Sequence, residues 1–220
     1  MNTDIARFNM IEQQIRPWEV LDYEVLSLLA AVRREDFVPP AMRALAFVDT
    51  QVPLGDGQVM LEPKVEARLL QELQLQPGDR VLEIGTGSGF MAALLAHRGA
   101  QVLSLECRPA LAAAARHNLQ RNGVANVRVQ ELAAAQAVLG CPQEPPFDAI
   151  VLSGSLASVP QSLLRRLAPG GRLVAVVGEL PIMRATLIRR VADAAWAEEE
   201  LFDTVAPRLE GFEEPSRFTF

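Results

Sequence analysis

Helical and strand-like patterns of apolar residues alternate along the second part of the chain. Apolar residues recur at a spacing of three and four positions in four segments, which predicts helices over residues 63–75, 89–97, 109–122 and 160–167. Short apolar runs predict strands over residues 80–84, 101–105, 127–130, 147–152 and 172–177. Such alternation forms a mostly parallel sheet with helices on both faces. The pattern therefore predicts a Rossmann-like, doubly wound α/β fold with ligand sites at the carboxyl ends of its strands.

The two ends of the chain show different patterns. Residues 2–31 have apolar positions at helical spacing, and Pro17 divides them into two segments, the second with Asp22 as a candidate N-cap. These segments predict an N-terminal helical cap. Near the C-terminus, residues 186–191 and 199–205 are strand-like and predict an antiparallel hairpin that closes the sheet.

Two stretches lack a regular period. Residues 131–146 show no strong pattern. Residues 37–63 form a long irregular stretch that is marked by Pro39, Pro40, Pro53, Gly55 and Gly57. Because long loops without secondary structure are uncommon unless they are functional, the second stretch is a candidate lid or substrate loop. We therefore expect a cap and substrate loop over residues 1–62 and a cofactor-binding domain over residues 63–220.

Composition limits the class of protein. Half of the 220 residues are apolar, which suffices for one sizeable core. The balance of 21 Lys and Arg against 27 Asp and Glu gives a formal charge of −6, which argues against nucleic acid as a partner. No apolar run approaches the roughly 20 residues that span a bilayer, and the N-terminus lacks a signal-peptide pattern, so we expect a cytoplasmic protein. Cys107 and Cys141 lack metal-ligand spacing, so we expect reduced thiols and no metal.

A glycine-rich turn joins the first predicted strand of the sheet to its helix. Gly85, Gly87 and Gly89 stand at this turn, where backbone N–H groups and the helix N-terminus are expected to face a ligand with an anionic group. The dinucleotide-binding fingerprint needs its third glycine at position 90, and Phe90 stands there. A pyrophosphate cofactor is therefore disfavoured.

Two acidic residues flank this turn. Glu106 ends the second strand 17 residues after Gly89, where folds of this type present a carboxylate to ribose hydroxyls. Glu83, two residues before Gly85, is placed to face a ligand's ammonium group or to orient the loop. Cys107 borders the expected adenine pocket or is a small buried apolar residue. These features describe S-adenosylmethionine better than NAD; the alternative is a tight turn with solvent-exposed acids. The expected cofactor-binding residues here are Glu83, Gly85, Thr86, Gly87, Ser88, Gly89, Glu106 and Cys107.

Several segments resemble one known family, the protein-L-isoaspartate O-methyltransferases. The likeness covers nearly the whole chain and is carried by residues 32–39, 46–49, 53–58, 81–90, 146–150, 159–160 and 167–174. The segment VRREDFVP resembles the family's N-terminal signature, and VLEIGTGSGF resembles its cofactor motif. The resemblance implies a methyltransferase fold, S-adenosylmethionine as the cofactor, and methyl transfer to a protein or peptide carboxylate. The oligomeric state stays open between monomer and homodimer.

The chain departs from the family pattern at two places. The family usually has Thr-Ile-Ser-Gln-Pro after the substrate-loop glycine, whereas this chain has Val59-Met60-Leu61-Glu62-Pro63. By resemblance, Leu61 and Glu62 face the acceptor, so a hydroxyl is lost and a negative charge is gained there. The family's adenine-contacting Gly-Asp-Gly is also absent, and its role falls to Glu131 or to the Leu132 backbone.

Three functions remain open at this point. The first is a protein carboxyl methyltransferase that repairs isoaspartyl residues, and the second is a methyltransferase with another acceptor, small molecules included. The third is a protein that binds the cofactor without transferring the methyl group. A carboxylate acceptor is ionised near neutral pH and needs no general base, which fits a chain whose two histidines, His97 and His117, lie on helices. The loss of the serine at Leu61 favours the second and third functions over the first.

Overall fold

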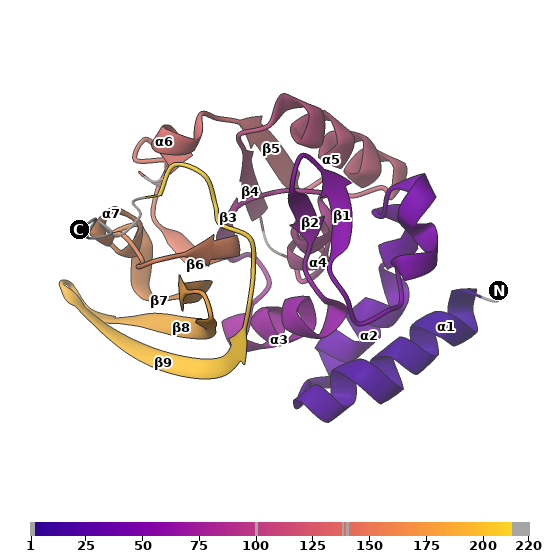
Figure 1. Cartoon of the computed structure of the whole chain (residues 1–220). Coiled ribbons are helices and arrows are strands. Elements are labelled where there is room, and N and C mark those ends of the chain that lie inside the picture. Colours follow the sequence, from indigo (N-terminus) through magenta and orange to yellow (C-terminus); the bar gives the residue numbers. More distant parts are fainter. Residues whose placement is uncertain (1–2, 100, 138, 140, 213–220) are drawn as a thin grey trace, which may run out of the picture.

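A seven-stranded sheet forms the centre of the protein (Figure 1). The computed structural model describes residues 3–99, 101–137, 139 and 141–212. The strand order is β5-β4-β3-β6-β7-β8-β9, in which β3 to β7 run parallel and β8 pairs antiparallel with both β7 and β9. The strand bounds are β3 Arg80–Ile84, β4 Gln101–Glu106, β5 Val127–Glu131, β6 Phe147–Leu156, β7 Leu167–Glu179, β8 Ile182–Ala192 and β9 Ala195–Thr204. The predicted doubly wound α/β fold and its closing hairpin are confirmed.

Helices cover both faces of the sheet. They are α3 Pro63–Leu73, α4 Phe90–His97, α5 Pro109–Arg121, α6 Ala134–Ala137 and α7 Gln161–Leu164. Alternate side chains of β3 enter two separate cores, Val81 the one with α3 and α4 and Leu82 the one with α6 and α7. Because both faces are buried, the central strands appear in the sequence as continuous apolar runs. The helix expected over residues 160–167 is shorter than predicted, because the chain joins β7 at Leu167.

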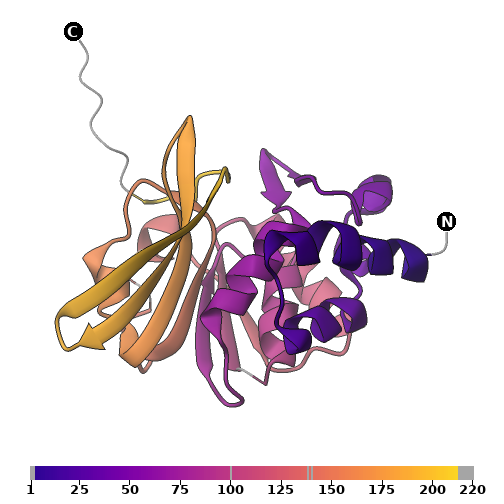
Figure 2. The same cartoon turned by 90° about the horizontal axis from the view of Figure 1, so that it is seen from below.

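The N-terminal cap packs on the face that carries α3 and α4 (Figure 2). It contains α1 Thr3–Met10, a π-helical turn Ile11–Ile15, a 3-10 turn Arg16–Trp18 and α2 Tyr23–Ala31. Asp22 caps α2 as predicted, since its Oδ1 accepts hydrogen bonds from the N–H groups of Glu24 at 2.8 Å and Val25 at 3.3 Å. In the described part of the chain, no helix has the length and apolar character that would cross a membrane.

The prediction of an irregular stretch over residues 37–63 is partly wrong. A 3-10 helix occupies Pro40–Leu45, and a β-hairpin follows with β1 Val52–Gly55 and β2 Gln58–Met60. Asp56 and Gly57 make its turn with φ angles of 49° and 74°. An Asp-Gly pair is a strong signal for such a turn, but the flanking strands are too short to show a clear period.

A C-terminal strap, defined here as residues 206–210, crosses the end of β6 after β9 (Figure 1). Ser155 N–H donates to the Pro207 carbonyl at 2.7 Å, and Leu209 N–H donates to the Ser155 carbonyl at 2.9 Å. Gly154 permits this approach, because a Cβ there would lie 2.9 Å from Leu209 side-chain atoms. The strap therefore brings the C-terminal part of the chain over the carboxyl ends of the central strands.

Candidate functional site

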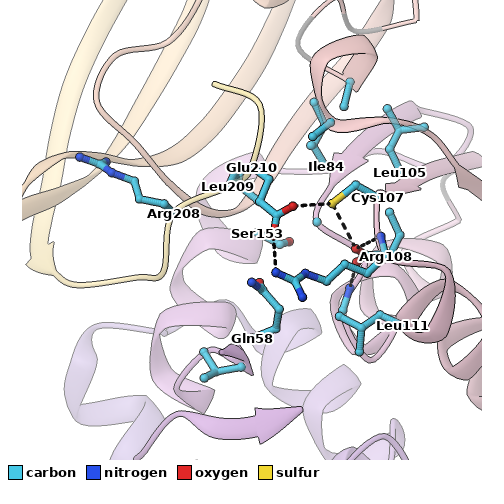
Figure 3. A pocket seen from close by; sticks show the side chains of 16 residues that line it. Gln58, Ile84, Leu105, Cys107, Arg108, Leu111, Ser153, Arg208, Leu209 and Glu210 are labelled. Atoms are coloured by element: carbon cyan, nitrogen blue, oxygen red, sulfur yellow. Dashed lines mark hydrogen bonds and ion pairs between the residues drawn. The ribbon is translucent and has the colours of Figure 1, made fainter. Parts of the chain in front are cut away.

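A cavity, whose empty volume of about 580 Å³ includes open solvent, lies at the carboxyl ends of β3, β4 and β6 (Figure 3). The glycine loop and Glu106 form one wall, whereas Gln58 and Val59 of the hairpin and Leu209 of the strap form others. Chain segments that are far apart in the sequence thus enclose one space. The position agrees with the ligand site predicted for this type of sheet.

The glycine loop adopts the tight turn that its composition predicts. The φ angles of Gly85, Gly87 and Gly89 are 95°, 54° and 85°, which side chains rarely adopt. Contrary to expectation, four of its N–H groups donate within the protein and are not free for an anionic ligand. Those of Gly85 and Thr86 donate to the Leu105 carbonyl, that of Gly89 donates to the Thr86 carbonyl, and that of Gly87 donates to Glu106. A loop satisfied in this way is a poor phosphate cradle, which strengthens the argument against a dinucleotide.

Glu106 is fixed at the end of β4 by two backbone groups. Its Oε2 accepts the Gly87 N–H at 2.9 Å, and its Oε1 accepts the Arg108 N–H at 3.0 Å. The side chain is buried, yet the residue lines the cavity. Each carboxylate oxygen has further lone pairs, so Glu106 can accept hydrogen bonds from a pair of ligand hydroxyl groups. This is the arrangement that a ribose requires.

Glu83 is completely buried between two neighbouring strands. Ser104 on β4 donates its hydroxyl to Oε2 at 2.6 Å, and Ser153 on β6 donates to Oε1 at 3.0 Å. Burial raises the pKa of Glu83 to about 8; the two serine hydrogen bonds oppose this rise, and the charges of Glu66 and Glu106 add to it. The carboxyl group thus titrates near neutral pH at the base of the glycine loop.

A smaller space, called here the inner chamber, adjoins the cavity at the glycine loop, and its empty volume of about 280 Å³ includes open solvent. The two spaces share Gly85, Gly87, Val59 and Ser153 as walls. The chamber is lined further by the predicted site residues Leu61, Glu83, Thr86 and Ser88, and by Glu66 of α3.

Glu66 forms an ion pair with the buried guanidinium of Arg34. Burial raises the pKa of Glu66 to about 7, although the Arg34 charge and hydrogen bond lower it. A second guanidinium nitrogen of Arg34 donates to the Leu61 carbonyl at 2.7 Å. The pair therefore holds the substrate loop against α3.

Charged residues close the mouth of the cavity (Figure 3). Arg108 forms an ion pair with Glu210 of the strap and lies 3.9 Å from Asp56 at the hairpin turn. The Cys107 thiol lies 3.7 Å from Glu210, and burial together with the Glu106 and Glu210 charges raises its pKa to about 11. Cys107 thus borders the cavity as predicted, as a neutral thiol.

Four predicted site residues lie outside the walls of both spaces. Glu62 is half-buried at the start of α3, where Gln51 Nε2 lies 3.5 Å from its Oε2. Gly89 faces α5 instead, because a Cβ there would meet Ala115 and Leu119 at 3.3 Å. The remaining two are Glu131, which is exposed, and Leu132, whose N–H donates to the Glu106 carbonyl at 3.0 Å.

Sequence reasoning missed several residues that line these spaces. Ala134 and Ala137 come from α6, a helix of four residues without a detectable period. Ser153 lies on β6, and the strap follows β9. Both strands were predicted, but no local pattern shows that these segments meet at the cavity. Glu66 did leave a signal, since it shares the buried stripe of α3 with Leu69, Leu70 and Leu73. A carboxylate at such a position needs a partner.

A family profile matches nearly the whole chain. The profile of the family described as protein-L-isoaspartate(D-aspartate) O-methyltransferase (PCMT) matches residues 6–205. The chain belongs to this family. Membership confirms the predicted family and methyltransferase class, and S-adenosylmethionine is the cofactor of this class.

Curated relatives in the family match most of the chain. A protein-L-isoaspartate O-methyltransferase of Methanoculleus marisnigri is 42% identical over 172 residues, which are 78% of this chain and 77% of the relative. A protein-L-isoaspartate O-methyltransferase 2 of Marinobacter nauticus is 40% identical over 202 residues, 91% of this chain and 90% of the relative.

A solved structure shares the fold. It is a Plasmodium falciparum protein described as a β-aspartate methyltransferase (PCMT) in complex with S-adenosyl-L-homocysteine. Its TM-score is 0.79 at 21% sequence identity, and the match covers 96% of this chain and 99% of that one.

Replacing Gly87 with valine should abolish cofactor binding. The glycine lines both spaces at a φ of 54°, and a Cβ would lie 3.3 Å from Leu54, so a larger side chain must displace the loop or fill the cavity. Calorimetric titration with S-adenosylhomocysteine measures this, with circular dichroism to establish that the variant is folded. A folded variant that binds like the wild type would refute the assignment of the loop.

Replacing Glu83 with glutamine should flatten the pH dependence of stability in the ligand-free protein. The folded-state pKa of about 8 exceeds the usual value of 4.5, so the contribution to stability is present below pH 4.5 and is lost as the pH rises towards 8. Denaturant titrations from pH 5 to 8.5 should show a difference in slope between wild type and variant that accumulates to on the order of 3 kcal/mol. Parallel curves would show that Glu83 does not titrate in this range.

Proposed function

We propose that the protein transfers a methyl group from S-adenosylmethionine to the carboxylate of an isoaspartyl residue in a protein or peptide. Its curated relatives carry the name of this activity. The observation that carries the proposal is the meeting of hairpin and cofactor loop. Gln58 and Val59 line the same cavity as Glu106 and Gly87, so an acceptor that contacts the hairpin stands next to the cofactor.

Some residues at the cavity bind the cofactor, and others close the cavity around it. Glu106 receives the ribose hydroxyls, and the glycine loop allows close approach of the ligand to the backbone. The cofactor, when bound, supplies a methyl group on a sulfonium centre. The hairpin and the strap form walls of the cavity and limit the access of water to it. An in-line displacement requires the acceptor and the methyl group to be held in line without water between them. A carboxylate acceptor arrives ionised, so no residue has to remove a proton from it.

Cys107 does not compete with the substrate as a methyl acceptor. The thiolate is the nucleophilic form of cysteine, and the pKa of about 11 keeps this thiol protonated at neutral pH. Its role is to line the cavity beside Glu106.

A second candidate is a methyltransferase that prefers another acceptor. Leu61 is buried and lines the inner chamber with an apolar side chain, where the family has a hydroxyl. The neighbouring Glu62 carries a negative charge that would repel an anionic acceptor. Burial is the main cause of the raised pKa of Glu66, and the Glu62 charge adds to it. Arg34 donates a hydrogen bond to the Leu61 carbonyl and so holds the backbone of the loop in place. The difference from the family pattern therefore lies in the side chains of Leu61 and Glu62.

The direct test is transfer of a labelled methyl group to an isoaspartyl peptide and to its normal aspartyl twin. Methylation of the isoaspartyl peptide alone supports the proposal. Methylation of neither peptide, by a protein that binds the cofactor, favours the second candidate or a protein that binds without transfer.

The double change Leu61→Ser with Glu62→Gln should raise isoaspartyl turnover. A hydrogen bond to a charged group contributes roughly 1.5–3 kcal/mol, about ten- to hundredfold in rate if it acts in the transition state. Removal of the Glu62 charge should add to the gain. Initial rates with the same peptide measure the effect, and Glu62→Gln alone separates charge from hydroxyl. A wild-type rate that equals that of the double variant would show that another residue supplies the contact.

A further inference from the structure

We propose that Glu66, together with Glu83, binds the α-ammonium group at the amino-acid end of the cofactor in the inner chamber. The proposal rests on the proposed function, because it takes S-adenosylmethionine as the ligand. It assigns a binding role to a residue outside the glycine motif, on a helix that precedes it in the chain.

The shape of the two spaces places the amino-acid end there. Glu106, which suits the ribose, lies in the outer cavity, and the chamber adjoins this cavity across Gly85, Gly87 and Ser153. The nucleoside therefore occupies the outer space, and the part of the cofactor beyond the sulfonium extends under the glycine loop. This part is a zwitterion, so it needs an anionic partner for its ammonium group and a donor for its carboxylate.

The chamber offers that chemistry. Glu66 and Glu83 both line it, and both are buried, with 5% and 0% of their surfaces exposed. Ser88 also lines it; its oxygen accepts the Phe90 N–H at 3.3 Å, and its own hydroxyl proton can be donated to a ligand carboxylate. The outer mouth offers less to an ammonium group, because Glu210 is already paired with Arg108.

The charge balance of the chamber favours a cationic ligand. The Arg34 guanidinium pairs with Glu66 and lies 5.0 Å from the centre of the Phe90 ring, so its position is fixed. Glu83 is held by serine hydroxyls, which neutralise no charge. An ammonium group that contacts both carboxylates would relieve the repulsion between them.

In the described part of the chain, charged groups act on this pair from three elements. Arg34 faces Glu66 from the 3-10 turn Arg34–Asp36, Glu62 acts on it from the start of α3, and Glu106 acts on Glu83 from β4. Both carboxyl groups bind protons near neutral pH. An ammonium ligand stabilises the ionised forms, so its binding should release protons and tighten as the pH rises from 6 to 8.

Two ligands separate this role from a structural one. S-adenosylhomocysteine carries the ammonium group, and 5′-methylthioadenosine has the same nucleoside without the amino acid. By calorimetry at pH 8, Glu66→Gln should lower the affinity for S-adenosylhomocysteine about ten- to hundredfold. It should leave the affinity for 5′-methylthioadenosine within about twofold of the wild-type value. Glu72→Gln is the matched control, because Glu72 lies on the same helix and pairs with Arg68 outside the chamber.

Proton release by the wild type supplies a test that does not depend on the variant's folding. Titrations at pH 7 in two buffers with different ionisation heats should show protons released with S-adenosylhomocysteine and fewer with 5′-methylthioadenosine. Equal weakening of both ligands by Glu66→Gln, or equal proton release, would overturn the proposal. A wild type that binds neither ligand would overturn the cofactor assignment itself, whereas normal binding by Glu66→Gln would overturn only the role of Glu66.

Discussion

Buried carboxylates at the carboxyl ends of the central strands determine how the site is built. Glu66 has a guanidinium partner in Arg34. The contacts described for Glu83 and Glu106 come from uncharged donors: serine hydroxyls for Glu83, and backbone N–H groups and the Cys107 thiol for Glu106. These contacts orient the carboxyl groups without supplying a positive charge. Burial therefore keeps Glu83 largely protonated at neutral pH in the ligand-free protein. A ligand that supplies a cation would stabilise its ionised form.

The same carboxylates connect the elements of the fold. Glu83 ties β3 to both neighbouring strands, and Glu106 ties the end of β4 to the glycine loop. Arg34, through Glu66 and the Leu61 carbonyl, ties the N-terminal cap to α3 and to the substrate loop. A change of charge at Glu66 can therefore alter the position of the substrate loop, because Arg34 contacts both. Leu61 and Glu62 lie at or next to this junction, and in the proposed function they alter the side of the site that meets the acceptor while the scaffold is retained.

The sequence predicted most of the sheet, because strands buried on both faces leave continuous apolar runs between helices. It also predicted Glu106, since the distance from glycine loop to acid is set by one helix and one strand. The hairpin was missed because its strands have four and three residues, too few to show a period. The strap was missed because its contacts with Ser155 depend on tertiary structure. Glu66 was passed over because acids within helices are usually solvated, and only the buried stripe distinguishes it.

A crystal structure with S-adenosylhomocysteine bound would test the roles of these carboxylates directly. We expect the adenosine in the outer cavity, with its ribose hydroxyls on Glu106. We expect the α-ammonium nitrogen in the inner chamber, within hydrogen-bonding distance (about 3.2 Å or less) of a Glu66 or Glu83 oxygen. An amino-acid end that turns outward towards Arg108, or that directs its carboxylate at Arg34 and leaves both acids without the ammonium group, would contradict these roles.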